Sequence, residues 1–166
     1  MADIVERAIE TQVLTDTDFA PFGVVIRPTP DGTLAGPIDR ALDLSEGRPR
    51  FYILALEERS LRIKGITRHH QTTQVLASVG GADWFIVVAP PSPDSASPKL
   101  DAVRAFRIPG DVAILMKRGT WHAGPYFLGP AMSFFNLELE DTNIVDHDTC
   151  SLPATFGVTF ALSTDA

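Results

Sequence analysis

The feature that most constrains the fold of this chain is its division into short β-rich segments by proline and glycine. Thirteen prolines and twelve glycines lie among the 166 residues. They bound segments rich in branched and aromatic residues, namely 51–57, 61–67, 74–80, 83–90, 102–108, 111–117 and 132–140. No long amphipathic helix is indicated after residue 10. So many short strands predict an all-β sandwich or barrel.

The remaining segments are expected to form turns and loops of one domain that spans residues 1–166. Residues 14–23 predict a short capped helical turn, with Thr15 or Thr17 as the cap. Residues 28–50 are expected to be mostly loop. The Pro/Ser-rich stretch 90–100 indicates a mobile surface loop rather than a domain linker, because strands resume directly after it.

Composition and charge limit the partners and the compartment. The net charge of −7 disfavours binding to nucleic acid. The single cysteine, Cys150, excludes an internal disulfide framework and favours a reducing compartment. The acidic start of the chain lacks a signal-peptide core, and no apolar run is long enough to span a membrane. We therefore expect a cytoplasmic protein with a small-molecule partner, and neither nucleic acid nor membrane.

Two polar clusters, Arg68–Gln74 and Lys117–Tyr126, lie far apart in the sequence. Small β-barrels commonly bind a ligand at the mouth, which gives a geometric reason for the two clusters to meet. Arg68 and Lys117 carry positive charges that can neutralise a carboxylate, although such residues also commonly solvate strand ends. The sequence therefore predicts a small carboxylate as the ligand of a shared cavity.

The second cluster also contains aromatic side chains and a histidine. Trp121 and Tyr126 can form the wall of an apolar pocket. His122 is a candidate acid or base, because imidazole titrates close to neutral pH, and a hydrogen-bonded histidine at the rim is the alternative. Trp121 and Tyr126 are therefore candidates to contact the substrate, and His122 is the candidate catalytic group.

The adjacent histidines His69 and His70 cannot both face one pocket from a regular strand, because side chains alternate between its two faces. Strict alternation places Arg68, His70 and Gln74 together and His69 opposite them. A bulge or turn near residue 71 would change this arrangement. We expect one of the two histidines to have only a structural role.

Two later segments allow two interpretations each. Asn136 and Glu138 alternate with apolar residues, which is typical of the solvated face of an antiparallel strand. In a barrel with a polar mouth the same two side chains would point inward. Asp146–Asp148 contains residue types that ligate metals, but it follows the last clear strand. We interpret it as a surface turn.

The two clusters resemble the two sequence motifs of cupin barrels. Matching positions are His70, Gln74 and Gly81 in the first motif and Gly110, Gly119 and His122 in the second. Arg68 stands where a histidine ligand belongs, and Gln74 replaces an acid. Because arginine cannot ligate and glutamine is a weak ligand, the pattern disfavours the usual metal site. A divalent metal held by His69 or His70 with His122, with or without Gln74, is the alternative.

Most of the chain, from about residue 11 to 150, resembles the ureidoglycolate lyase family. The resemblance lies in LTDTDFAPFGVVI at 14–26, GRPRFYILAL at 47–56, TRHHQTTQVLASV at 67–79 and the Trp121–His122 turn. It implies a cupin-like jelly-roll barrel that forms a homodimer. It also implies cleavage of ureidoglycolate to glyoxylate and urea, a step of allantoin breakdown in purine catabolism.

The resemblance also implies roles for individual residues. It favours His69 over His70, so His122 and His69 are expected to form the acid–base pair. Arg68 or Lys117 would hold the carboxylate, Gln74 would bind the ureido group, and Trp121 would exclude water. No redox cofactor is expected.

The chain departs from the family pattern at Thr67, which stands in place of a glutamate. This departure leaves a related carbinolamide or hydroxy acid open as the substrate. The alternative functions are a carboxylate-binding barrel without turnover and a metal-dependent cupin enzyme.

Overall fold

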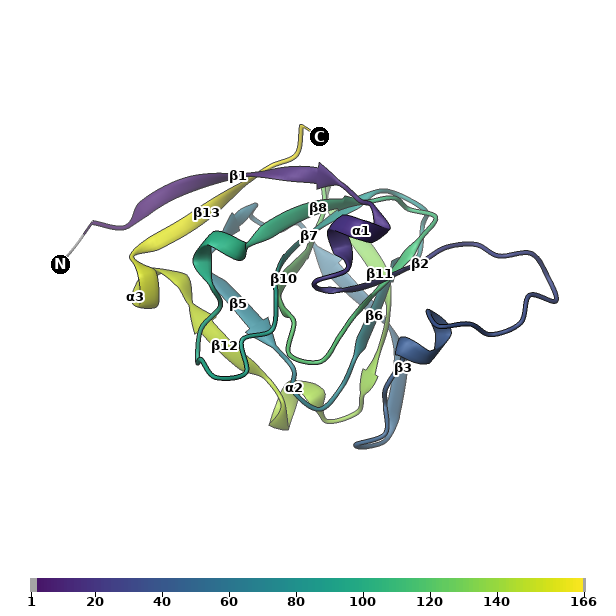
Figure 1. Ribbon diagram of the computed structural model, residues 1–166. Coiled ribbons are helices and arrows are strands. Elements are labelled where there is room, and N and C mark those ends of the chain that lie inside the picture. The colour runs from purple at the N-terminus through teal and green to yellow at the C-terminus, as the bar shows by residue number, and fades with distance from the viewer. Residues whose placement is uncertain (1–2, 166) are drawn as a thin grey trace.

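The computed structural model describes residues 3–165, and its strands form two sheets (Figure 1). The first sheet has five strands in the order β2 (Gly23–Ile26), β9 (Ala113–Met116), β6 (Gln74–Ser78), β11 (Ala131–Leu139) and β3 (Pro49–Glu57). The second has eight strands in the order β12 (Asp148–Ser151), β5 (Gly65–Arg68), β10 (Trp121–Tyr126), β7 (Trp84–Ala89), β8 (Arg104–Ile108), β1 (Val5–Val13), β13 (Val158–Ser163) and β4 (Arg62–Ile63). The predicted all-β fold is confirmed.

Helices are short in the part of the chain that the structure describes. They are α1 (Asp16–Phe19), α2 (Thr142–Val145), α3 (Leu152–Phe156) and the 3₁₀ turns η1 (Asp39–Ala41) and η2 (Leu100–Ala102). Thr15 caps α1, as its sequence predicts, because its hydroxyl accepts a hydrogen bond from the Asp18 backbone N–H at 3.1 Å. None of the helices within residues 3–165 is long and apolar enough to cross a membrane.

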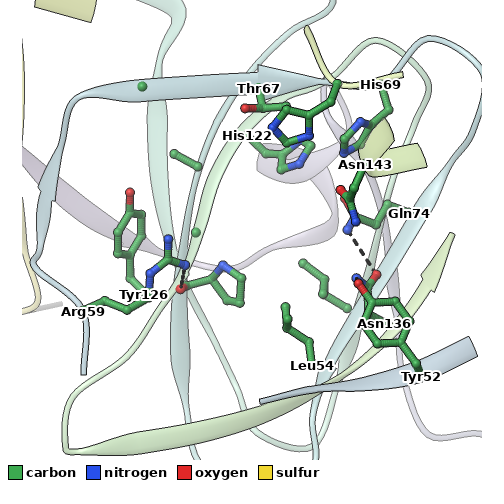
Figure 2. Close-up of a pocket in the computed structure, with 16 residues that line it drawn as sticks. Tyr52, Leu54, Arg59, Thr67, His69, Gln74, His122, Tyr126, Asn136 and Asn143 are labelled. Carbon is green, nitrogen blue, oxygen red and sulfur yellow. Dashed lines mark hydrogen bonds between the residues drawn. The ribbon is translucent and has the colours of Figure 1, made fainter. Parts of the chain in front are cut away.

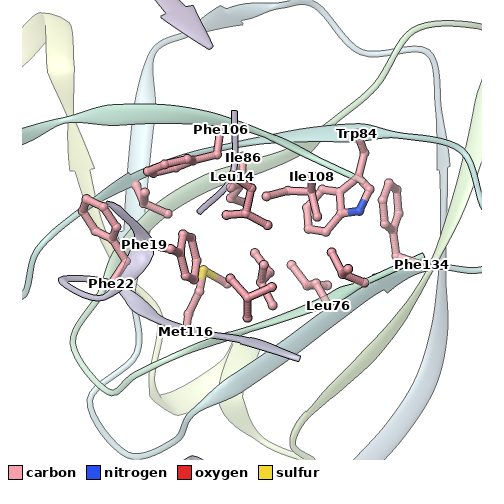
Figure 3. Close-up of a cluster of buried hydrophobic side chains, with 14 of the residues drawn as sticks. Leu14, Phe19, Phe22, Leu76, Trp84, Ile86, Phe106, Ile108, Met116 and Phe134 are labelled. Carbon is pink, nitrogen blue, oxygen red and sulfur yellow. The ribbon is translucent and has the colours of Figure 1, made fainter. Parts of the chain in front are cut away.

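The main hydrophobic core lies between the two sheets, where aromatic rings from several elements meet (Figure 3). Phe19 and Phe106 pack edge to face with ring centroids 5.5 Å apart, and Trp84 packs against Phe134 at 5.2 Å. Removing this much apolar surface from water is the main stabilising contribution to such a fold. The packed core therefore fills one part of the barrel and leaves its polar end for a site.

Strand β7 is buried on both faces, because the eight-stranded sheet has a second core on its other side. Trp84, Ile86 and Val88 belong to the core between the sheets, whereas Phe85, Val87 and Ala89 belong to the second cluster. The second cluster also contains side chains from β13 and α3. This double burial explains why β7 is continuously apolar rather than alternating.

Several strands differ from the sequence-based expectation. The predicted strand 61–67 is divided into β4 and β5, and β1, β10, β12 and β13 were not predicted as strands. Strand β10 contains Gly124 and Pro125, which usually mark turns, and its register with β7 shifts between Ala123 and Tyr126. Strands β1 and β13 pair in parallel and extend the sheet beyond the expected core of about 11–150.

Candidate active site

A cavity of about 350 Å³ lies between the two sheets at the polar end of the barrel (Figure 2). Its lining combines side chains from β3, β6 and β11 of one sheet with side chains from β5 and β10 of the other. The residues used below are Tyr52, Arg59, Thr67, His69, Gln74, His122, Tyr126, Asn136, Asn143 and His147. A volume of this size accommodates a small organic acid.

His69 and His122 lie side by side at one end of the cavity, with ring centroids 4.9 Å apart (Figure 2). His122 is on β10 opposite Thr67 of β5, so the two side chains point to the same face of the sheet. His69 follows β5 directly and continues that face. The prediction that the two histidine turns share one cavity is therefore confirmed.

The crossing of the chain from one sheet to the other explains how His69 and Gln74 reach the same cavity. Strand β5 belongs to the eight-stranded sheet and β6 to the five-stranded sheet, so residues 69–73 span the gap. The buried carboxylate of Asp146 fixes this turn by accepting hydrogen bonds from the backbone N–H groups of His70 and Gln71, at 2.7 and 2.8 Å. Because residues 69–73 form this crossing, their side chains do not alternate strictly between two faces as they would in a regular strand.

Both imidazoles of the pair are held in one tautomer by backbone carbonyl groups. A carbonyl oxygen can only accept, so the Nδ1–H of His69 donates to Asp146 and that of His122 donates to Thr120 at 3.2 Å. Among residues 3–165, neither Nε2 atom has a hydrogen-bond partner. Each ring therefore keeps an unprotonated Nε2 that can accept a proton from a ligand.

Burial keeps the histidine pair neutral. It is the main reason that the pKa of His122 is lowered to about 3, and the charge on neighbouring His69 contributes to the same decrease. Burial also lowers the pKa of His69, partly offset by its hydrogen bond to the Asp146 carbonyl. The lowered pKa keeps both rings unprotonated at neutral pH, so each can act as a proton acceptor, and it makes each ring a weaker base than a free imidazole.

One side of the cavity carries a positive charge. Arg59 lies there beside Tyr126, with its guanidinium carbon 5.2 Å from the centre of the phenol ring (Figure 2). Its Nη1 donates to the backbone carbonyl of Pro125 at 2.8 Å. No carboxylate pairs with Arg59 among the described residues, and it is the one arginine or lysine that lines the cavity there. This side of the cavity can therefore accept an anion.

The opposite side of the cavity is a wall of amide and hydroxyl groups (Figure 2). The amide of Gln74 donates to Asn136 at 3.1 Å and to the buried carboxylate of Glu138 at 3.3 Å. Asn136 donates to the hydroxyl of Tyr52 at 2.9 Å, and this hydroxyl donates to Glu138 at 3.0 Å. Of the two interpretations of strand 132–140, the inward orientation of Asn136 and Glu138 is therefore the one observed.

Arg68 and Trp121 lie outside the cavity, contrary to the expectation that they contact the substrate. They occupy the opposite face of β5 and β10 from Thr67 and His122, because side chains alternate along a strand. The guanidinium of Arg68 stacks over the fully buried indole at 4.2 Å and pairs with Asp148 at 2.8 Å. Both side chains also hydrogen-bond to Ser92 of the Pro/Ser-rich loop. Their arrangement fixes that loop rather than a ligand.

Two further predicted residues do not line the cavity itself, and one segment is more buried than expected. Lys117 is exposed and lines a small adjoining recess that also contacts His69, Gln74 and His122. His70 is half-exposed and its ring lies 3.5 Å from Asp148. The segment Asp146–Asp148 is more than a surface turn, because Asp146 is buried and His147 lines the cavity, with its ring centroid 5.7 Å from that of His69.

The side chains at the cavity do not form the metal site that a cupin pattern suggests. The Nδ1–H bonds of the histidine pair to backbone carbonyls leave both Nε2 atoms available, but Arg68, which stands at the position of a cupin histidine ligand, lies outside the cavity. Within residues 3–165, no group of three or more His, Cys, Asp or Glu side chains is arranged to hold a metal ion.

Comparison with known proteins gives the family. The family model for ureidoglycolate lyase matches residues 6–159. This chain belongs to the ureidoglycolate lyase family. A ureidoglycolate lyase of Schizosaccharomyces pombe is 26% identical over 181 residues, which cover 90% of this chain and 92% of that protein.

Solved structures with similar folds are more distant than the family itself. Bacillus subtilis oxalate decarboxylase has a TM-score of 0.42 at 10% identity, over 64% of this chain and 24% of the decarboxylase. RmlC from Streptococcus suis has a TM-score of 0.39 at 12% identity, over 57% of this chain and 45% of RmlC. The chain thus spans about a quarter of the decarboxylase and less than half of RmlC.

Several residues of this lyase-family cavity were not identified from the sequence. Arg59 lies in a turn between strands, where an arginine is usually only a solvated surface residue. Tyr52 is an even-numbered residue of β3 and faces inward with Leu54, whereas the odd-numbered Phe51 and Ile53 are exposed. The apolar side chains of Phe51 and Ile53 would instead predict that their own face of β3 is buried, because the apolar face of a strand is normally the buried one.

Proposed function

We propose that this chain cleaves ureidoglycolate into glyoxylate and urea. The observation that carries the proposal is the pair of neutral imidazoles, His69 and His122, whose Nε2 atoms are both unengaged at one end of a polar cavity. The substrate is a carbinolamide, so its cleavage needs only the movement of a proton from a hydroxyl group to a nitrogen. Such general acid–base assistance is typically worth about 10²- to 10⁴-fold in rate.

The proton follows a short path in the proposed reaction. One Nε2 atom of the histidine pair accepts the hydroxyl proton, and the oxygen's electron pair forms the carbonyl group of glyoxylate. The carbon–nitrogen bond breaks, and its electrons remain on the urea nitrogen. That nitrogen then takes a proton back from the pair. No oxidation state changes, so the proposal includes no redox cofactor.

Arg59 takes the role that the sequence suggested for Arg68 or Lys117. Its guanidinium has no carboxylate partner among residues 3–165, so it can pair with the carboxylate of ureidoglycolate. Tyr126 borders the same side and keeps its substrate-contact role in the proposal. This places the carboxylate at one side of the cavity, the amide wall opposite, and the reacting carbon beneath the histidines.

The deciding experiment is a paired assay of glyoxylate and urea with the purified protein and ureidoglycolate. We expect equal amounts of both products, and a loss of at least about 100-fold in kcat for His122→Ala. The matched control is His70→Ala, which removes a neighbouring imidazole outside the cavity and should retain the wild-type rate. Absence of both products with the folded wild-type protein would refute the proposed activity.

We further propose that two copies of the chain pair through the outer face of β3 and β11, in keeping with the homodimer that the family resemblance implies. Strand β3 is at the edge of its sheet, and Phe51 and Ile53 are 67% and 56% exposed. Phe51 stacks on Phe135 at 5.8 Å, which extends the apolar surface onto β11. An edge strand with such a face is suited to a self-complementary contact.

The compartment also stays a proposal. Cys150 is buried and free, which is compatible with the reducing cytoplasm that the single cysteine suggested.

A further inference from the structure

The polar wall of the cavity has a fixed direction of hydrogen bonding, and the buried side chain of Glu138 sets it. Its carboxylate is 1% exposed and accepts hydrogen bonds from the Tyr52 hydroxyl, the Gln74 amide and, at 3.1 Å, the Asn143 amide. No cation pairs with this carboxylate among the described residues. Three neutral donors therefore turn their hydrogens towards Glu138.

This direction decides which atoms of the wall are left for a ligand. Because the NH₂ groups of Gln74 and Asn143 face Glu138, their carbonyl oxygens are the ends that are not used. The Oε1 atom of Gln74 is buried and has no hydrogen-bond partner within residues 3–165. Buried polar atoms are nearly always paired in folded proteins, so an unpaired acceptor in a cavity wall indicates a donor supplied by a ligand.

We infer that Glu138 is a positioning residue that makes this wall specific for ligand groups that donate N–H bonds, such as a ureido group. The inference rests on the proposed function for the identity of the ligand, and it assigns an orientation to it. The N–H groups of the ligand face Gln74 and Asn143, and the carboxylate of the ligand faces Arg59. A ligand that presents oxygen atoms to the wall leaves the acceptors unpaired and is rejected.

The test uses two ligands that cannot be cleaved and that are similar in length. N-carbamoylglycine is ureidoglycolate without its hydroxyl group, and monomethyl succinate has the same charge and one additional methyl group but no N–H group. Calorimetry with the wild-type protein should give a Kd for N-carbamoylglycine about 10- to 100-fold lower than that for monomethyl succinate. Equal affinities, or a preference for the ester, would overturn the inference.

The variant Glu138→Gln separates positioning from general stability. Its amide can donate as well as accept, so Gln74 is free to turn its NH₂ group towards the cavity, and the affinity ratio should fall towards one. The matched control is Glu140→Gln, which removes an exposed carboxylate two residues away and should keep the wild-type ratio. A wild-type ratio in folded Glu138→Gln would overturn the inference.

A second variant covers the case in which Glu138→Gln does not fold. Gln74→Leu removes the acceptor itself while keeping similar volume, and it should lower the same ratio; an unchanged ratio would count against the wall. Because these ligands are not turned over, the affinity ratio is independent of lyase activity. If the protein had no lyase activity but still preferred N-carbamoylglycine, the proposed reaction would be refuted. The inference that the polar wall accepts N–H bonds would still be supported.

Discussion

Replacing His122 by asparagine should make the folded protein less sensitive to acid. Burial lowers the pKa of this imidazole from 6.5 to about 3, so between these values the unfolded chain binds a proton that the folded chain does not. The free energy of unfolding therefore falls as the pH falls through this window. At pH 5, which is about 1.5 pH units below 6.5, this proton uptake lowers the free energy of unfolding by about 2 kcal/mol.

Denaturant unfolding at pH 7.5 and at pH 5 measures this difference, because most carboxylates remain ionised at both values. Asparagine can still donate an N–H bond to the Thr120 carbonyl, so the variant should fold. Its stability should change by about 2 kcal/mol less than that of the wild type between the two pH values. His70→Asn is the control, and it measures how the loss of an exposed histidine changes the same difference in stability.

The result that would refute this reasoning is an equal loss of stability in the wild type and in His122→Asn. It would mean that His122 is not held neutral by burial in the folded protein. The description of the histidine pair as a neutral proton acceptor would then also fail.

Four other changes test separate parts of the structure. Arg59→Gln should raise KM for ureidoglycolate at least about tenfold, because a charge-assisted bond to the carboxylate is lost, with a smaller effect on kcat. Arg68→Gln should lower the free energy of unfolding by about 1–3 kcal/mol through loss of its pair with Asp148, and leave KM unchanged, as thermal denaturation and steady-state kinetics would show. Asp146→Asn should lower kcat by loosening the turn that holds His69, which a normal rate would contradict. Phe51→Asp should convert a dimer to a monomer in light scattering, and an unchanged mass would exclude this face.

The sequence predicted the fold class and the two histidine-containing clusters because both can be recognised from short stretches of sequence. Short apolar segments bounded by proline and glycine indicate strands wherever they lie in the chain. His69, Gln74 and His122 were identified by residue type and by their resemblance to a family, and the structure places all three at one cavity. These inferences needed no knowledge of which strands are neighbours.

The tertiary structure decided which face of each strand is inside. Along β11 the polar Asn136 and Glu138 point into the barrel, while the apolar Phe135 lies on the outer face. Arg68 and His69 are adjacent in sequence but face opposite sides of the eight-stranded sheet, so only His69 reaches the cavity. The sequence pattern shows that side chains alternate, but not which set is enclosed.

Taken by itself, the sequence determined that this chain forms short strands and carries a histidine in each of two polar clusters. Only the tertiary structure decided that Arg59, rather than Arg68, supplies the positive charge at the cavity. The physical reason is that two features depend on residues distant in sequence. These are the crossing of the chain between the two sheets at residues 69–73 and the pairing of Arg68 with Asp148.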